Sequence, residues 1–414
     1  MTLINRLIGH RLIMLVMIAM VAAVLTAACG DDDDETLKIG FLNAFSGPLA
    51  EFGPAIQTGV ELAIEHINAA GGVLGNDVVF VTGDTQVDAT QGIEEARRLV
   101  EIEGVHAIVG PLASSVALAV SESVTADARI PVISPSATSP ALSTAPDNGY
   151  LFRSTISDAA QGVVLAQLAT DEGFDNVAVL FLNDAYGQGL AEAFENAFGG
   201  TVTKASFEDG AASYLAELQA AADGGSDVLV AIGFPPQAEI FIREALENDI
   251  FSKFLFVDGT KSEDLIEAIG AENLEGFKGT APGAGPESAA LQAWNAAYEA
   301  KYGALPTLPF VREAYDATIA IALAAQFAGS TDGAAIRDAL PKIGNPGGTA
   351  YIPGAAGIAG ALKAVKDKKD INYEGAATTL DWDANGDVTS GYVGIWRYAG
   401  GTIEELEQIP FSVD

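Results

Sequence analysis

The chain has 414 residues, of which 49% are hydrophobic and 19% charged, and its formal net charge is −35. A chain of this length exceeds one ordinary core and suits two domains. The acidic balance argues against nucleic acid and anionic membrane surfaces as partners.

The first 28 residues are typical of a secretory signal peptide. Arg6 and Arg11 form a basic start, and the run from Leu12 to Ala28 contains no acidic residue. A transmembrane anchor is the alternative, but the run is shorter than the roughly 20 residues that a span prefers. We therefore expect residues 1–28 to be removed and the globular part to lie outside the cytoplasmic membrane.

The only cysteine, Cys29, follows Leu25-Thr26-Ala27-Ala28, a pattern that resembles a lipoprotein cleavage site. The match is imperfect, because Thr26 stands where leucine is usual. We predict that Cys29 carries the lipid and that residues 29–36 form an acidic tether, since Asp31–Glu35 repel one another. No thiol then remains for a disulfide, a metal site or covalent catalysis. The chain beyond residue 28 has a net charge of −37, which we interpret as a solvated acidic surface.

From Leu37 onward, short β-rich runs alternate with amphipathic helical patterns, which predicts βαβ units and a parallel sheet. In the first half the expected strands are Leu37–Leu42, Val78–Thr82, Ala107–Val109 and Val132–Ser134, and the expected helices are Ala55–Ala69, Ala89–Glu103 and Ser115–Asp127. Gly71 and Gly72 are expected to end the first helix, because glycine adopts the left-handed cap without steric cost.

A second series with the same alternation follows Arg153 and predicts a second, similar lobe. Its expected helices are Ala159–Thr170, Gly189–Phe198, Tyr214–Ala222 and Ala238–Glu247, and its expected strands are Val177–Leu182, Thr201–Phe207, Val228–Ile232 and Phe254–Asp258. Two long helices, Ala289–Tyr302 and Val311–Ala328, and hairpin-like strands at Ala377–Asp381 and Gly391–Tyr398 are expected after them.

Polar residues follow two neighbouring strands of the first lobe. The segment Gly110–Ser115 ends a strand and opens a helix, where free backbone N–H groups suit a carboxylate. Ser114 or Ser115 acting only as a helix N-cap is the competing interpretation. The cluster Ser134–Pro140 follows the next strand, and a stiff turn with solvated hydroxyls is its alternative.

The second lobe offers the opposite charge. Asp258 lies at the C-terminal end of an expected strand, although it could instead cap the next helix. Phe52, Tyr186 and Phe234 are flanked by glycine or proline, which favours loops rather than the core. An anion-binding site on one lobe and a cation-binding site on the other would give a ligand with both charges a reason to close the cleft, since charge-assisted hydrogen bonds contribute about 1.5–3 kcal/mol each.

The segment Asp381–Asp387 resembles the first half of a calcium-binding EF-hand loop, but its twelfth position is Tyr392 rather than glutamate. A tight turn at Asn385-Gly386 is therefore the better interpretation. No Gly-x-Ser-x-Gly elbow, phosphate loop or His-Glu-x-x-His motif occurs. We interpret His66 and His106 as packing or surface residues. We expect no enzymatic activity, no metal and no cofactor.

These motifs together resemble the type I periplasmic binding proteins, in particular the branched-chain amino acid binding proteins of ABC importers. The resemblance rests on Phe45–Gly53, the turn Gly71–Gly75 and the two polar clusters, and it spans Leu37 to Val413. It implies an α/β fold of two doubly wound parallel-sheet lobes joined by a three-segment hinge. Lobe 1 would comprise residues 37–155 with about 286–370, and lobe 2 residues 156–285 with about 371–414.

The resemblance also implies roles for individual residues. Ser114, Ser136 and Thr138 would hold the α-carboxylate of an amino acid, and Asp258 its α-ammonium. Phe52, Tyr186 and Phe234 would form the walls around its side chain, and Leu112 and Ala113 would line the site beside Ser114.

The function implied is that of a lipid-anchored binding protein on the outer face of the bacterial cytoplasmic membrane, which delivers a small amino-acid-like ligand to an ABC permease. A sensory receptor for amides or amino acids is the alternative. A secreted hydrolase is a second rival, which turnover of an ester or amide would reveal.

Overall fold

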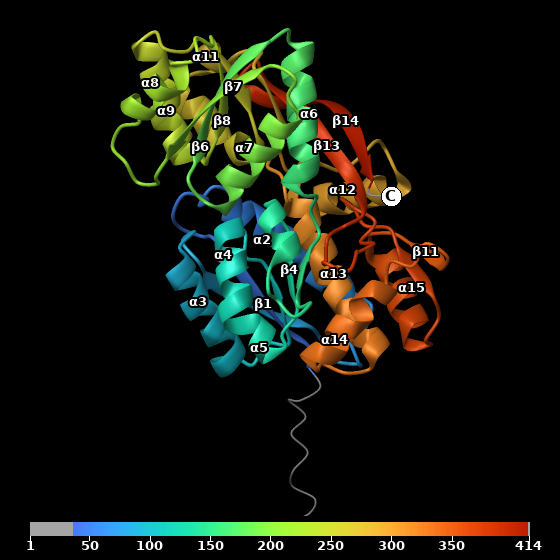
Figure 1. Ribbon diagram of the computed structural model, residues 1–414. Coiled ribbons are helices and arrows are strands. Elements are labelled where there is room, and N and C mark those ends of the chain that lie inside the picture. The colour runs from blue at the N-terminus through green and yellow to red at the C-terminus, as the bar shows by residue number, and fades with distance from the viewer. Residues whose placement is uncertain (1–35, 413–414) are drawn as a thin grey trace, which may run out of the picture.

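The computed structural model describes residues 36–412, so the signal peptide, Cys29 and most of the acidic tether lie outside the described residues. Two β-sheets, each flanked by helices, lie one above the other in Figure 1. The chain enters the lower sheet first, builds most of the upper one next and then returns to the lower half before its last strands join the upper sheet.

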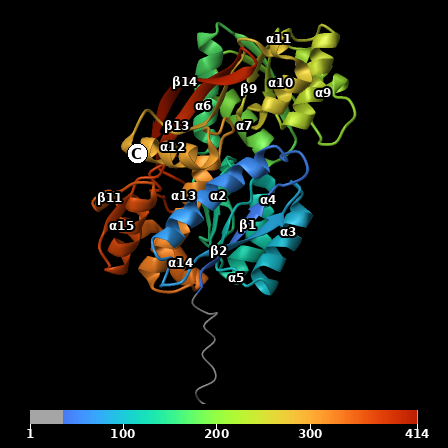
Figure 2. The ribbon, with the colours of Figure 1, turned by 180° about the vertical axis from the view of Figure 1, so that it is seen from behind.

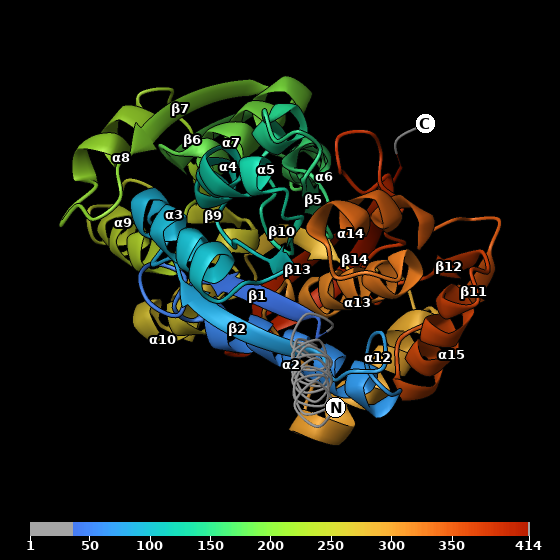
Figure 3. The ribbon, with the colours of Figure 1, turned by 90° about the horizontal axis from the view of Figure 1, so that it is seen from below.

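The first sheet has five parallel strands in the order β2-β1-β3-β4-β5. Its strands are β1 (Lys38–Asn43), β2 (Val79–Asp84), β3 (Ala107–Val109), β4 (Val132–Ser134) and β5 (Leu151–Arg153). The helices between them are α2 (Phe52–Ala69), α3 (Ala89–Arg97), η2 (Arg98–Ile102), α4 (Ser114–Val120), η3 (Ser121–Thr125), α5 (Ala126–Ala128) and η4 (Pro140–Thr144). Figure 3 shows α2 and α3 on opposite sides of β1 and β2.

The second sheet has the order β14-β13-β10-β9-β8-β6-β7, and only β13 and β14 run antiparallel to their neighbours. Its elements up to the return of the chain are α6 (Asp158–Asp171), β6 (Asn176–Leu182), α7 (Ala185–Ala197), β7 (Thr201–Phe207), α8 (Leu215–Ala222), β8 (Val228–Ile232), α9 (Pro235–Glu247), β9 (Lys253–Phe256), η5 (Asp258–Thr260), α10 (Glu263–Ile269), α11 (Ala271–Leu274) and β10 (Lys278–Gly283).

The chain passes between the halves three times, after β5, after β10 and after β12. The elements of the return are α12 (Ala289–Tyr302), α13 (Val311–Ala328), α14 (Gly333–Ala339), η6 (Leu340–Lys342), β11 (Thr349–Tyr351), α15 (Ala355–Lys366) and β12 (Ile371–Tyr373). The final strands are β13 (Ser390–Ala399) and β14 (Thr402–Ser412). Figure 2 shows α2, α13 and α15 in the lower half and β13 and β14 in the upper half.

The core follows from the parallel sheets, which bury strands on both faces. Every residue of β8 is buried, and α13 is buried over nearly its whole length. Helices α2 and α13 pack closely, because a Cβ at Gly59 would lie 2.1 Å from the carbonyl oxygen of Val311. Within residues 36–412, no single helix is long and apolar enough to cross a membrane, and only α13 taken with the bent segment after it passes that test.

The expected fold class is confirmed, and most strands of both series fall within a residue or two of their predicted bounds. The first helix ends at Gly71 and Gly72, whose φ angles are +97° and +71°. The expected helix Ala89–Glu103 instead leaves α-geometry at Arg98 and continues as a wider π-helical turn.

The strand predicted at Ala377–Asp381 is wrong. The N–H groups of Ala376 and Ala377 donate to the buried carboxylate of Asp316 and not to a neighbouring strand. Strand β13 pairs instead with β10 and β14.

The turn at Asp381–Asp387 is held by hydrogen bonds of its own residues. The Asp383 carboxylate accepts the N–H groups of Asn385 and Asp387 at 2.8 and 3.0 Å, and Gly386 has a φ of +76°. Within residues 36–412, no group of three or more His, Cys, Asp or Glu side chains could hold a metal ion.

Candidate ligand-binding site

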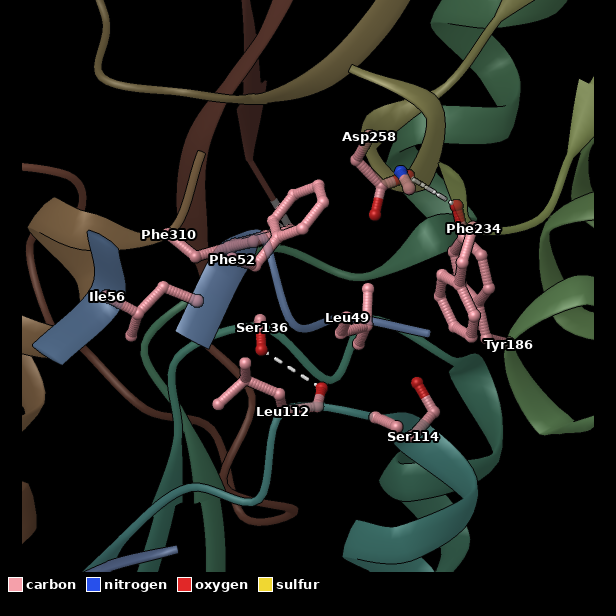
Figure 4. Close-up of a pocket in the computed structure, with 12 residues that line it drawn as sticks. Leu49, Phe52, Ile56, Leu112, Ser114, Ser136, Tyr186, Phe234, Asp258 and Phe310 are labelled. Carbon is pink, nitrogen blue, oxygen red and sulfur yellow. Dashed lines mark hydrogen bonds between the residues drawn. The ribbon is translucent and has the colours of Figure 1, made fainter. Parts of the chain in front are cut away.

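Ligands in open α/β sheets bind beyond the carboxyl ends of the strands, where the strand order reverses. The order reverses between β1 and β3 in the first sheet and between β6 and β8 in the second. The segments after these four strands and after their neighbours β4 and β9, together with the segment before α13, enclose one cavity (Figure 4). Its lining residues are Leu49, Phe52, Ile56, Leu112, Ala113, Ser114, Ser136, Tyr186, Phe234, Asp258, Gly259 and Phe310.

The two halves are closed around this cavity. Phe52, Ser114 and Asp258 are only 2–3% exposed, although they come from different halves of the molecule. A ligand must therefore enter through a more open arrangement.

The first-sheet side of the cavity carries hydroxyl groups. A Cβ at Gly110 would lie 1.9 Å from the carbonyl oxygen of Leu42, so only glycine lets the loop after β3 turn here. The Ser114 Oγ accepts the Ser139 N–H at 3.2 Å, which leaves its own hydroxyl proton free to donate. The Ser136 Oγ donates to the Leu112 carbonyl at 3.0 Å. The N-cap of α4 is Ala113, so neither Ser114 nor Ser115 is the N-cap that the alternative interpretation proposed.

Thr138 lies differently from the expectation. It is buried behind the cavity lining, and its Oγ1 donates to the Asp158 carboxylate at 3.0 Å. The Thr138 hydroxyl is therefore hydrogen-bonded to Asp158, which was not among the predicted site residues.

The second-sheet side of the cavity carries an acid held by aromatic and amide groups. The Tyr186 hydroxyl and the Gln161 Nε2 each donate to Asp258 Oδ1 at 2.8 Å. The rings of Tyr186 and Phe234 stack with an interplanar angle of 7°. In Figure 4, Asp258, Tyr186 and Phe234 face Ser114, Ser136 and Leu112 across the cavity.

Two carboxylates are buried near one another here. Burial raises the pKa of Asp258, against the hydrogen bonds from Gln161 and Tyr186. Burial, and next the negative charge of Asp258, raise the pKa of Asp158 well above its usual range. The Asp158 Oδ1 has no hydrogen-bond partner within residues 36–412. A bound cation would satisfy both groups, since an opposite charge favours the ionised form.

The remaining lining is apolar. Eight predicted residues line the cavity: Phe52, Leu112, Ala113, Ser114, Ser136, Tyr186, Phe234 and Asp258. Four further lining residues were not predicted, namely Leu49, Ile56, Gly259 and Phe310. Asp158 and Gln161, which lie behind the lining, were not predicted either. Asp158 and Gln161 are three residues apart at the start of α6, so their shared helix face was a signal that sequence reasoning could have used.

His66 and His106 are structural, as expected. The Nδ1 of buried His66 is 2.8 Å from the Tyr315 hydroxyl, and the His106 Nδ1 accepts the Lys38 N–H at 3.0 Å. Neither lines the cavity.

Comparison with known proteins identifies the family. Residues 36–354 match the periplasmic binding protein family, and the chain belongs to it. It is 28% identical over 376 residues to Leu/Ile/Val-binding protein homolog 3 of Brucella melitensis, covering 90% of this chain and 94% of that protein. It is 27% identical over 383 residues to the chemotactic signal transduction system substrate-binding protein BasB of Halobacterium salinarum, covering 87% and 86%.

A solved structure agrees with this membership. The branched-chain amino acid transporter substrate binding protein LivJ of Streptococcus pneumoniae, in complex with isoleucine, superposes with a TM-score of 0.73 and 27% identity over 91% of this chain and 99% of that one. The resemblance to type I periplasmic binding proteins of the branched-chain amino acid type is therefore confirmed.

Proposed function

We propose that this protein captures a small amino acid of the branched-chain type between its two lobes and delivers it to an ABC permease. The observation that carries the proposal is the cavity's opposed polarity, with the hydroxyl of Ser114 on one side and the buried Asp258 on the other. An α-carboxylate fits the first side and an α-ammonium the second. The apolar residues between them suit an uncharged side chain.

The site residues proposed are Ser114, Ser136 and Thr138 for the carboxylate and Asp258 for the ammonium. To donate to the carboxylate, the Ser136 hydroxyl would have to turn away from the Leu112 carbonyl and the Thr138 hydroxyl away from Asp158. Asp158 would then join Asp258 at the ammonium. Phe52, Leu112, Ala113, Tyr186 and Phe234 would surround the side chain.

We place lobe 1 at residues 37–155 with about 286–370, and lobe 2 at residues 156–285 with about 371–414. The passage of the chain after β5, β10 and β12 supports a hinge of three segments. Because β12 (Ile371–Tyr373) pairs with β11, the third crossing follows Tyr373, slightly later than the predicted bound.

The protein would work outside the cytoplasmic membrane, held there by lipid on Cys29. Support comes from the sequence before Cys29 and from the family. Replacing Cys29 with serine should release the protein from cells into the medium and abolish its labelling by a palmitate analogue. Retention of the Cys29→Ser protein in the membrane fraction would contradict lipid anchoring.

Thermal unfolding with leucine, isoleucine or valine tests the ligand class. A ligand at 100 times its Kd adds about 2.7 kcal/mol to the stability of the native state, so a clear rise in Tm is expected. Isoamylamine and 4-methylpentanoate are matched controls, since each lacks one charged group of leucine. If either raises Tm as much as leucine, the two-charge assignment fails.

A sensory role is the second candidate, and the similarity to BasB favours it. In that role the protein would bind the same ligand, and its closed form would be recognised by a chemoreceptor instead of a permease. Purification of the ligand-bound protein from membranes distinguishes the import role from the sensory role. Co-purification of permease and ATPase subunits supports import, whereas co-purification of a chemoreceptor supports sensing.

A further inference from the structure

Arg153, at the end of β5, lies next to the candidate site without lining it. Its side chain is 1% exposed, and a buried guanidinium requires partners. The Nη1 donates to the carbonyl oxygens of Thr138 and Ser139, both at 3.0 Å. The Nε donates to Asp387 Oδ1 at 2.6 Å.

Asp387 belongs to the turn Asp381–Asp387, whose spacing resembles half of a calcium loop. The turn is fixed to the strand that carries Arg153, because the Arg153 N–H donates to the Gly386 carbonyl at 3.0 Å and the Trp382 Nε1 donates to the Arg153 carbonyl at 2.8 Å. Asp387, the last acidic residue of this turn, therefore forms an ion pair with Arg153.

Ser143 closes the network. Its Oγ accepts from Arg153 Nη2 at 2.9 Å and donates to Asp387 Oδ2 at 2.6 Å. The guanidinium thus touches two loop carbonyls, one hydroxyl and one carboxylate. Charge-assisted hydrogen bonds of this kind fix geometry as well as adding stability.

The orientation of the loop after β4 depends on these carbonyl contacts. The carbonyl oxygen of Ser139 accepts a hydrogen bond from Arg153, and the N–H of Ser139 donates to the Ser114 Oγ. That N–H occupies an acceptor site of Ser114 and so leaves the Ser114 proton for a ligand. A shift of the loop would remove this arrangement.

We propose that Arg153 and Asp387 are positioning residues for the anion-binding side of the cavity. They hold the loop after β4 so that Ser114 and Ser136 meet the ligand's carboxylate, and neither residue touches the ligand. This inference rests on the proposed function, because it presumes that the hydroxyl side of the cavity takes the carboxylate.

The test compares Asp387→Asn and Asp387→Glu with the wild-type protein, using leucine as the probe in calorimetry and amide hydrogen exchange of residues 136–139 without ligand. Asp387→Asn should weaken leucine binding roughly tenfold, as expected when a charge-assisted pair that orders a site is lost. It should also accelerate exchange of the Ser139 amide. Asp387→Glu keeps the negative charge, so its leucine affinity and its Ser139 amide exchange should both stay close to those of the wild-type protein.

Asp332→Asn is the matched control, since Asp332 is an exposed carboxylate whose Oδ1 accepts the Ala335 N–H at the start of α14. Asparagine caps a helix about as well as aspartate, so leucine affinity should stay within about twofold. An equal loss of affinity in Asp332→Asn would overturn the proposal, as would wild-type affinity and exchange in Asp387→Asn.

Two further outcomes are distinguishable. If the wild-type protein binds no amino acid, the proposed function fails, while the exchange comparison still decides the positioning role. If Asp387→Asn does not fold, Ser143→Ala removes one partner of Arg153 and should weaken leucine binding about threefold. Unchanged binding and exchange in Ser143→Ala would then overturn the positioning role.

Discussion

Asp258 and Asp158 are buried within one closed site, and the negative charge of Asp258 opposes ionisation of Asp158. Their raised pKa values mean that ionising both carboxyl groups in the closed form is costly unless a cation lies beside them. A ligand ammonium would supply that cation, so ligand binding and closure are expected to depend on the same charge.

Asp258→Asn tests whether the Asp258 carboxylate binds the ammonium of the ligand. An asparagine Oδ1 can still accept from Gln161 and Tyr186, so the fold should persist and the ligand-free Tm should not fall. Leucine affinity should drop roughly 100-fold, because a buried partner of a charged group is removed. Calorimetry measures the affinity.

Asp223→Asn, at an exposed position after α8, is the control. Unchanged leucine affinity in Asp258→Asn would show that Asp258 does not hold the ammonium.

The cavity residues that sequence reasoning found share a local signal, a polar or aromatic residue directly after a strand. Ser114, Tyr186 and Asp258 carry it, and the structure brings them together. Phe310 lies before a helix of the returning segment, so no local pattern linked it to the others. The partner of Thr138 could not be predicted either, because Asp158 reaches it only through tertiary packing.

At the scale of elements, the two halves also touch where α7 faces η4. The Ser139 Oγ donates to the Ala185 carbonyl at 2.6 Å, and a Cβ at Gly189 would lie 2.7 Å from Pro140 Cδ. The closed arrangement therefore requires a residue without a side chain at position 189.

Gly189→Ala should weaken leucine binding several-fold without any contact to the ligand, because the closed form is selectively strained. X-ray scattering of the leucine-bound protein should give a larger radius of gyration than for wild type.

Gly199→Ala is the matched control, since a Cβ there would meet no atom within 4 Å. If Gly189→Ala closes and binds as wild type does, the α7–η4 contact has no influence on closure.

Helix α13 connects the hinge segments through buried polar groups. The Ser154 Oγ donates to the Glu313 carbonyl at 2.9 Å, and the Asp316 carboxylate accepts the N–H groups of Ala376 and Ala377. Burial raises the pKa of Glu313 to about 7.

Stability should therefore fall as pH rises. Because the folded protein binds the Glu313 proton more tightly than the unfolded chain does, this contribution is complete below about pH 4.5 and is lost as pH rises through about 7. Glu313→Gln should reduce the change in unfolding free energy between pH 5 and pH 8 by up to about 3 kcal/mol. Urea unfolding at both pH values measures it.

Glu122→Gln, at an exposed site, should leave the pH dependence unchanged. An unaltered slope in Glu313→Gln would contradict the raised pKa.

Sequence periodicity located α12 and α13 with their observed bounds, since both are long and carry regular apolar positions. It missed β5, α10, α11, β10, β14 and the elements from α14 to β12. The strand predicted at Ala377–Asp381 failed because its N–H groups bind a distant carboxylate, a choice that local composition does not encode.

On the scale of the whole molecule, closure creates contacts that exist only when the halves meet. Glu51, in the loop after β1, accepts hydrogen bonds from the Ser262 hydroxyl and from the Glu263 N–H, the latter at 2.9 Å. This contact joins the first half to the start of α10 in the second half. Its energy adds to that of the ligand, so it should slow ligand release.

Glu51→Ala should accelerate leucine dissociation about tenfold, since it removes a charged acceptor shared by two donors, while the association rate changes little. Stopped-flow displacement of leucine measures the dissociation rate. Glu94→Ala, exposed on α3, controls for the loss of one negative charge. If Glu51→Ala slowed leucine association and left dissociation unchanged, the contact between Glu51 and the start of α10 would not hold the closed form shut.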